Sequence, residues 1–122
     1  MVTRTAAAVL SAILLLGCGS GGTSDGGLRD NVETYSAAYL GNEPEKAIAL
    51  ISARCKERID LATMGKLTAG AQARYVSARI TGYEAKVSGG LARVTYRYTD
   101  PAIDQVDQPW AKEGGRWLRD AC

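Results

Sequence analysis

The residues of this 122-residue chain that could do acid–base chemistry are carboxylates and tyrosines, because the sequence contains no histidine. That absence excludes Ser-His and Cys-His nucleophilic pairs, histidine general bases and histidine metal ligands. A carboxylate base with a tyrosine hydroxyl as oxyanion donor would still suffice for proton transfer next to a carbonyl. The nearest candidates for the base are Asp60, beside an apolar stretch, and Asp100, at a predicted strand end.

Other polar clusters give weaker signals. The spacing of Asp100, Asp104 and Asp107 does not match a calcium loop, so we interpret them as a solvated loop. The glycine pairs 89–90 and 114–115 lie between predicted strands, which is not the place of a phosphate loop. We therefore expect no metal and no cofactor.

Four arginines are expected on the outer sheet face: Arg93, Arg97, Arg116 and Arg119. The simplest expectation is that these arginines face solvent. The alternative is that they contact anionic lipid headgroups or cell-wall polymers.

The charge balance argues against a nucleic-acid partner. The formal net charge is +2, and basic and acidic residues are interspersed. A basic block as short as Lys56-Glu57-Arg58 is already interrupted by an acid. Nucleic-acid binding needs a basic patch or stripe, which this pattern does not predict.

The N-terminal residues resemble a bacterial lipoprotein signal. Arg4 precedes an apolar run from Ala6 to Leu16, and Leu15-Leu16-Gly17-Cys18 has the order of a lipobox. The run is shorter than the roughly 20 residues that a bilayer-spanning helix needs. We predict a signal peptide over 1–17 and a lipid-bearing Cys18 that anchors the chain outside the cytoplasmic membrane. Ordinary cleavage at the small residues 19–22 is the alternative.

The organisation after Cys18 follows from composition and from the remaining cysteines. Residues 18–27 have almost no apolar content and predict a flexible tether, so the folded domain is expected over 28–122. If Cys18 is acylated, Cys55 and Cys122 remain, and a disulfide between them is the simplest outcome in an oxidising compartment. A buried free Cys55 with a frayed C-terminus is the alternative.

The hydrophobic pattern predicts helices first. Apolar residues at helical spacing predict a helix over 28–40, ended by Gly41. Asn42 is expected to cap a second helix that ends near Ser52, and a third is expected from Cys55 to Met64, ended by Gly65. Residues 66–76 allow a further helix, which Gly70 weakens.

From Ile80 the apolar period changes to two, which predicts strands. A turn at 88–90 separates strands over 80–87 and 92–99. A third strand is expected over 106–112, with Pro109 at an edge or a bulge, and a last strand over 116–122. Helices followed by an antiparallel meander of three or four strands predict an α+β fold, with the helices packed on a curved sheet.

Two segments resemble the nuclear transport factor 2-like (NTF2-like, cystatin-like cone) domains. One is the helix pair Tyr-Leu-Gly-Asn-Glu-Pro-Glu-Lys-Ala-Ile at 39–48, and the other is the closing hairpin from Trp110 to Cys122. The chain is most similar to the small secreted actinobacterial lipoproteins of that superfamily, several of which carry a similar cysteine pair. The resemblance implies a cone with a pocket between helices and sheet, and no particular activity.

These observations predict a non-catalytic, lipid-anchored binding or accessory domain for an apolar small molecule or a partner protein. Five aromatic residues are expected to form the pocket: Tyr35, Tyr39, Tyr83, Tyr96 and Trp110. The alternative is that these aromatics serve only as core or pocket-rim residues. The alternative function is an isomerase- or cyclase-like enzyme with a pocket carboxylate and a tyrosine. A third candidate is an accessory domain that forms a homodimer through its sheet.

Overall fold

A computed structural model describes residues 26–122, so the predicted signal peptide 1–17, Cys18 and most of the tether lie outside the described residues. Within this range the helices precede the strands, which confirms the predicted α+β class. The bounds are α1 Leu28–Leu40, α2 Pro44–Ile48, α3 Ala53–Lys56, α4 Leu61–Tyr75, β1 Ile80–Ser88, β2 Leu91–Tyr98, the 3-10 turn η1 Pro101–Ile103, β3 Gln105–Glu113 and β4 Arg116–Arg119.

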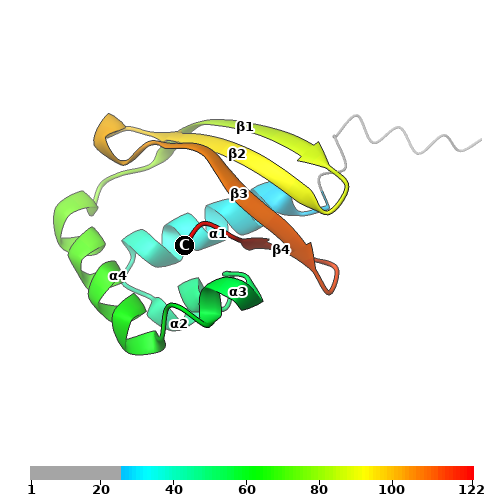
Figure 1. The fold of residues 1–122 in the computed structure, drawn as a ribbon. Coiled ribbons are helices and arrows are strands. Elements are labelled where there is room, and N and C mark those ends of the chain that lie inside the picture. Colours follow the sequence, from blue (N-terminus) through cyan, green and yellow to red (C-terminus); the bar gives the residue numbers. More distant parts are fainter. Residues whose placement is uncertain (1–25) are drawn as a thin grey trace, which may run out of the picture.

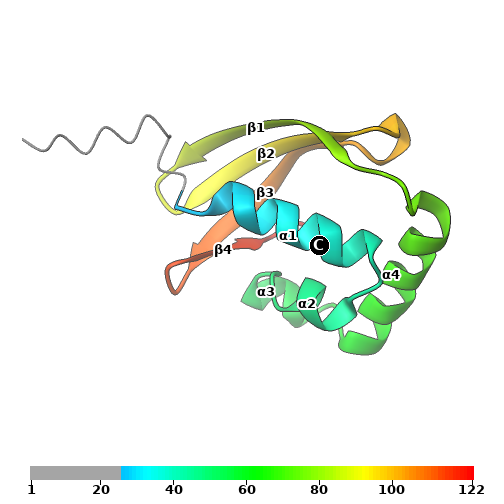
Figure 2. The ribbon, with the colours of Figure 1, turned by 180° about the vertical axis from the view of Figure 1, so that it is seen from behind.

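The four strands form an antiparallel meander in the order β1-β2-β3-β4. The sheet arches over α1, with α4 at one end and α2 and α3 below (Figure 1). The view from behind shows α1 running beneath β1 and β2, on the same side as the other helices (Figure 2). Because the helices share one side, the strands alternate between a buried and a solvated face, most regularly in β2.

The second helix differs from the sequence prediction at both ends. Asn42 adopts a left-handed φ of 55° and accepts a hydrogen bond from Thr68 Oγ1 (2.9 Å), so it links α1 to α2 and does not cap α2. The helix begins at Pro44, whose missing N–H is not needed in a first turn. Ser52 caps α3, because its hydroxyl accepts from the Cys55 N–H (3.3 Å).

The predicted helix over 55–64 with a stop at Gly65 is also wrong. The chain leaves the helical conformation after α3, and Asp60 then caps α4 by accepting from the Thr63 N–H at 2.7 Å. The new helix continues through both Gly65 and Gly70 to its end at Tyr75. Each glycine costs about 1 kcal/mol relative to alanine, and tertiary packing offsets this cost. The buried residues of α4 supply that packing: Met64, Thr68 and Ala71.

The strand predictions hold better. The turn at Gly89-Gly90 joins β1 to β2, with Gly89 at a left-handed φ of 58°. A register shift places a bulge in β3 around Asp107, which has a φ of 50°. Pro109 follows this bulge, and its carbonyl accepts from Asp120 N (2.9 Å) where β4 has ended. Pro109 therefore lies close to a bulge, although it is itself paired with Arg93 of β2.

The last strand ends at Arg119 and is shorter than the predicted 116–122, and the connection between α2 and α3 pairs with its outer edge. Ser52 N donates to the Arg119 carbonyl (2.8 Å), and Arg119 N donates to the Leu50 carbonyl (2.7 Å). The α2–α3 connection thus pairs with β4 in parallel, and the chain then turns toward α3. This pairing protects the β4 edge.

A disulfide and an ion pair fix the C-terminal residues to α3. Cys55 and Cys122 form a disulfide with Cα atoms 5.6 Å apart, as the cysteine count predicts. Asp120 accepts from the Ser52 hydroxyl (2.6 Å) and from Arg54 Nε (3.1 Å). Such a disulfide is typical of proteins that fold in an oxidising, extracytoplasmic compartment.

One hydrophobic core joins α1 to the sheet and to the α2–α3 segment. Its largest fully buried side chains are Trp110, Trp117, Tyr96, Leu28, Ile51, Met64, Val32 and Val94. Asn31 on α1 donates to the Trp117 carbonyl at 2.9 Å, which fixes the helix against β4. None of the helices in residues 26–122 is long and apolar enough to cross a membrane.

Candidate functional site

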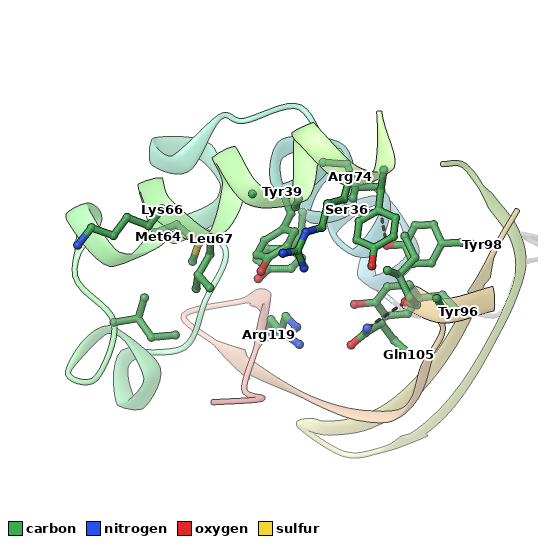
Figure 3. A pocket seen from close by; sticks show the side chains of 18 residues that line it. Ser36, Tyr39, Met64, Lys66, Leu67, Arg74, Tyr96, Tyr98, Gln105 and Arg119 are labelled. Carbon is green, nitrogen blue, oxygen red and sulfur yellow. Dashed lines mark hydrogen bonds between the residues drawn. The ribbon is translucent and has the colours of Figure 1, made fainter. Parts of the chain in front are cut away.

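A pocket of about 510 Å³ opens between α1, α4 and one end of the sheet. This volume lies within the range of small-molecule sites, roughly 300–1,000 Å³. Figure 3 shows Lys66 at one end of the pocket, and Tyr96, Tyr98 and Gln105 at the other. Eighteen residues line the pocket: Tyr35, Ser36, Tyr39, Leu40, Ile59, Met64, Lys66, Leu67, Gly70, Ala71, Arg74, Tyr75, Tyr96, Tyr98, Ala102, Ile103, Gln105 and Arg119.

Five tyrosines form the aromatic part of the lining, one of them Tyr75 at the end of α4 and the other four from α1 and β2. Tyr35 and Tyr39 are one helical turn apart on α1, with ring centroids separated by 5.8 Å. Tyr96 and Tyr98 alternate onto the buried face of β2, with centroids also 5.8 Å apart. The Ser36 and Tyr98 hydroxyls share a buried hydrogen bond that joins the two elements. The helix and the strand thus bring together tyrosines far apart in the sequence.

Phenols are protonated at neutral pH in any case, and burial raises the pKa of the four on α1 and β2 further. Burial raises the pKa of Tyr35 to about 12, although the nearby Arg119 guanidinium opposes the shift. Burial likewise raises the pKa of Tyr98 to about 12, against the hydrogen bond with Ser36. The pKa values of Tyr39 and Tyr96 are raised by burial too, and Arg119 again opposes the change. The pocket therefore offers neutral hydroxyls that can donate hydrogen bonds.

We predict that folding delays the ionisation of these tyrosines. Because the pKa of Tyr35 and of Tyr98 rises from 10.0 to about 12, the folded chain holds their protons more tightly than the unfolded chain. The resulting stability is fully present below pH 10 and is lost as the pH rises toward 12, with as much as about 3 kcal/mol at stake for each group. Near-ultraviolet tyrosinate absorbance of the folded and denaturant-unfolded protein measures this delay. Coincident titration curves would contradict it.

Arg119 lies under the aromatic lining. Its guanidinium stacks over the Tyr35 ring, with the carbon Cζ 5.2 Å from the ring centroid. It donates to the Ala121 carbonyl (2.8 Å) and to Gln108 Oε1 (3.3 Å). Its buried Nε has no hydrogen-bond partner among residues 26–122. The expectation that Arg119 lies on the outer sheet face is therefore wrong.

The alternation of β4 explains this inward position. Arg119 pairs with Trp110 across β3 and β4, and it stands two residues after the buried Trp117. Residues two apart in a strand point to the same face, so Arg119 points inward with both tryptophans. The other three arginines of the predicted stripe are exposed: Arg93, Arg97 and Arg116.

The charged residues of the lining all have the same sign. Lys66 and Arg74 on α4 are exposed at the pocket, and Arg119 is partly buried. No Asp or Glu is among the described residues that line it. Asp60 lies outside the lining and caps α4, and Asp100 caps η1. The predicted carboxylate-and-tyrosine enzyme therefore has no carboxylate base in this pocket.

The structure brings together three of the five predicted pocket residues, namely Tyr35, Tyr39 and Tyr96. Tyr83 lies on β1 outside the pocket lining, with the Arg29 guanidinium 5.0 Å above its ring. Trp110 is fully buried beneath the pocket and meets Tyr35 edge-on, with centroids 6.2 Å apart. Neither Tyr83 nor Trp110 belongs to the pocket surface.

Several lining residues were not predicted as pocket residues. The alternation that selects Tyr96 also selects Tyr98, since the two side chains share one face of β2. The helical spacing along α4 brings three residues to the pocket, namely Leu67, Ala71 and Arg74. Gly70 weakens the helix signal in this segment, so the spacing did not predict them as pocket residues. Ile103 reaches the pocket lining from η1, a three-residue turn that no hydrophobic periodicity in the sequence predicts.

The acidic residues of the described range do not gather into a metal site. No group of three or more Cys, Asp or Glu side chains among residues 26–122 is placed to hold a metal ion. Asp104 instead accepts from Tyr98 N at 2.8 Å, which ties the η1 loop to the end of β2.

Comparison with known proteins supports the fold alone. No protein-family model matches the chain, and no curated protein matches it in sequence. Among solved structures, the fold is similar to that of a Campylobacter jejuni protein described provisionally as an NTF2-like transpeptidase. The TM-score is 0.56 at 13% sequence identity, over 77% of this chain and 97% of the other. The domain therefore has an NTF2-like fold.

Proposed function

We propose that this chain is a lipid-anchored extracytoplasmic protein whose domain binds a small molecule with an apolar body, without catalysing a reaction. The observation that supports this most strongly is the pocket of about 510 Å³ lined by tyrosines and aliphatic side chains. Sites for small molecules are mostly apolar concave surfaces with a few polar groups that orient the ligand. The other apolar residues of the lining include Met64, Leu67 and Ile59.

Gly70 offers a direct test, because its position permits the pocket to be filled without disturbing the core. It lies in the pocket lining, and a Cβ built on it has no neighbouring atom within 4 Å. Tryptophan also has a higher helix propensity than glycine, so Gly70→Trp is not expected to weaken α4. The matched control is Ala69→Trp, which adds the indole at the neighbouring exposed position outside the lining.

We expect the uncharged fluorescent probe phenylnaphthylamine to bind the wild-type domain, because its rings match an apolar, aromatic pocket. Gly70→Trp should weaken binding by about tenfold or more, while Ala69→Trp should leave it within about twofold. Fluorescence titration measures both, and circular dichroism confirms folding. Absence of binding to the wild type, or equal binding by Gly70→Trp, would refute the pocket as a binding site.

The anchored location rests on Cys18 and is tested separately. We expect Cys18 to incorporate labelled fatty acid in a bacterium with lipoprotein processing, and the protein to sediment with membranes. Cys18→Ser should lose the label and leave the membrane fraction, because acyl chains supply the anchor. Cys122→Ser is the control, since it removes a cysteine outside the lipobox. An unlabelled wild type, or a Cys18→Ser variant that fractionates like it, would contradict the anchor.

A further inference from the structure

We propose that the ligand of this pocket carries an acidic group, a carboxylate, sulfonate or phosphate, which Arg119 holds among the tyrosine hydroxyls. This inference rests on the proposed function and names the chemical class of the ligand. It begins from the charges of the pocket, where Lys66, Arg74 and Arg119 have no acidic counterpart in the lining.

Arg119 is the first part of the argument. A partly buried cation normally has a carboxylate partner, because burial removes the water that would otherwise stabilise its charge. Among residues 26–122 no carboxylate lies within ion-pair distance of Arg119, although Asp120 is its neighbour in sequence. Asp120 instead pairs with Arg54 and accepts from Ser52. Asp120, the acidic residue adjacent in sequence, is therefore engaged by other residues, and the Arg119 charge has no carboxylate among residues 26–122 to balance it.

The second part concerns the hydrogen bonds that Arg119 does make. Its described partners are all neutral oxygens, those of Ala121 and Gln108 and the Tyr35 and Tyr96 hydroxyls, and its Nε has none among residues 26–122. A planar guanidinium suits acidic oxygens because several N–H groups lie in one plane. An acidic group at this position would supply the missing negative charge.

The third part concerns the surroundings of Arg119. The Tyr35 ring lies 5.2 Å from its Cζ and orients the guanidinium. The Tyr35 and Tyr96 hydroxyl oxygens accept hydrogen bonds from Arg119, so each hydroxyl keeps its own O–H as a donor for an acidic oxygen. Arg74, on the exposed surface of α4, has no ion-pair partner in the described part of the chain and adds attraction at the opening. The Arg119 charge beside the tyrosine hydroxyls and the apolar lining that includes Met64 and Leu67 together fit an acidic amphiphile.

Two fluorescent probes test this assignment. Anilinonaphthalene sulfonate and phenylnaphthylamine share the same rings, and only the first carries an acidic group. We expect the wild-type domain to bind the sulfonate about tenfold more tightly or better, as charge-assisted hydrogen bonds would give. Added salt should reduce this preference without changing the affinity for the neutral probe.

Four variants identify the charges responsible. Arg119→Gln should bring the affinity ratio of the two probes close to one, whereas Arg119→Lys should retain part of the preference. Arg74→Gln should lower it about threefold, since its charge is exposed and screened. Arg116→Gln removes the same charge from the exposed first residue of β4 and should leave the ratio unchanged.

Equal affinity of the wild type for both probes would overturn the acidic group and leave the apolar pocket intact. So would a ratio that Arg119→Gln leaves unchanged. If Arg119→Gln does not fold, the wild-type ratio and its response to Arg74→Gln and salt decide the question, and no response to either overturns the inference. Failure of both probes to bind would overturn the proposed function and this inference with it.

Discussion

Replacing both Cys55 and Cys122 by alanine is expected to lower the free energy of unfolding by about 4 kcal/mol. The bridge closes a loop over a sequence separation of 67 residues, and the loss of loop-closure entropy in the unfolded chain gives a value of this size. For a small domain with a total stability of roughly 5–15 kcal/mol, this is a large share. Equilibrium denaturation of the oxidised wild type and the double variant measures it.

The reduced wild type is the matched control. Its stability should fall to that of the double variant, and a reductant should not affect the variant. The same treatment should also loosen residues 120–122 and thereby the Ala121 carbonyl that supports Arg119. Sulfonate binding should then weaken more than binding of the neutral probe. Identical denaturation curves for oxidised and reduced wild type would contradict the stabilising role of the bridge.

Trp110→Ala should destabilise the domain by about 3–5 kcal/mol, the usual cost of truncating a buried tryptophan. The indole is fully buried, contacts Tyr35 edge-on, and fills the space between α1 and β3. Its Nε1 has no hydrogen-bond partner among the described residues, so Trp110→Phe removes an unsatisfied donor as well as volume. Trp110→Phe should therefore cost only about 1–2 kcal/mol.

Val106→Ala is the control on the same strand, because Val106 is 53% exposed. Its effect should stay within about 0.5 kcal/mol. Denaturant titrations of the oxidised variants measure all three changes. If Trp110→Ala unfolded at the wild-type denaturant concentration, Trp110 would not be a core residue and its assignment beneath the pocket would be wrong.

The fold class was predictable because the sequence changes period at one point. The first helix and the β1–β2 hairpin match their predicted ranges within a residue or so, since long periodic segments with glycine at their ends give local signals. The breaks between α2, α3 and α4 were not predictable in the same way. Gly65 has the local signature of a stop, and tertiary packing of α4 overrides it.

The site was only partly predictable for a related reason. Aromatic residues on one face of α1 and β2 could be identified by spacing, which placed Tyr35, Tyr39 and Tyr96 correctly. Whether a buried aromatic reaches a cavity or the core depends on how the layers meet, and this separates Trp110 from Tyr96. Arg119 was misplaced because a charged residue late in a strand is usually solvent-exposed. The position of Trp117 two residues earlier was the signal that placed it inside.

The central claim is that a small molecule occupies the pocket between α1, α4 and the sheet. Native mass spectrometry of the protein purified from its own membrane tests it most directly, with wild type and Gly70→Trp compared in parallel. We expect the wild type to retain a non-covalently bound small molecule, released on unfolding, and Gly70→Trp to lack it. A wild type that carries no such molecule, or a Gly70→Trp variant that carries the same one, would contradict the claim.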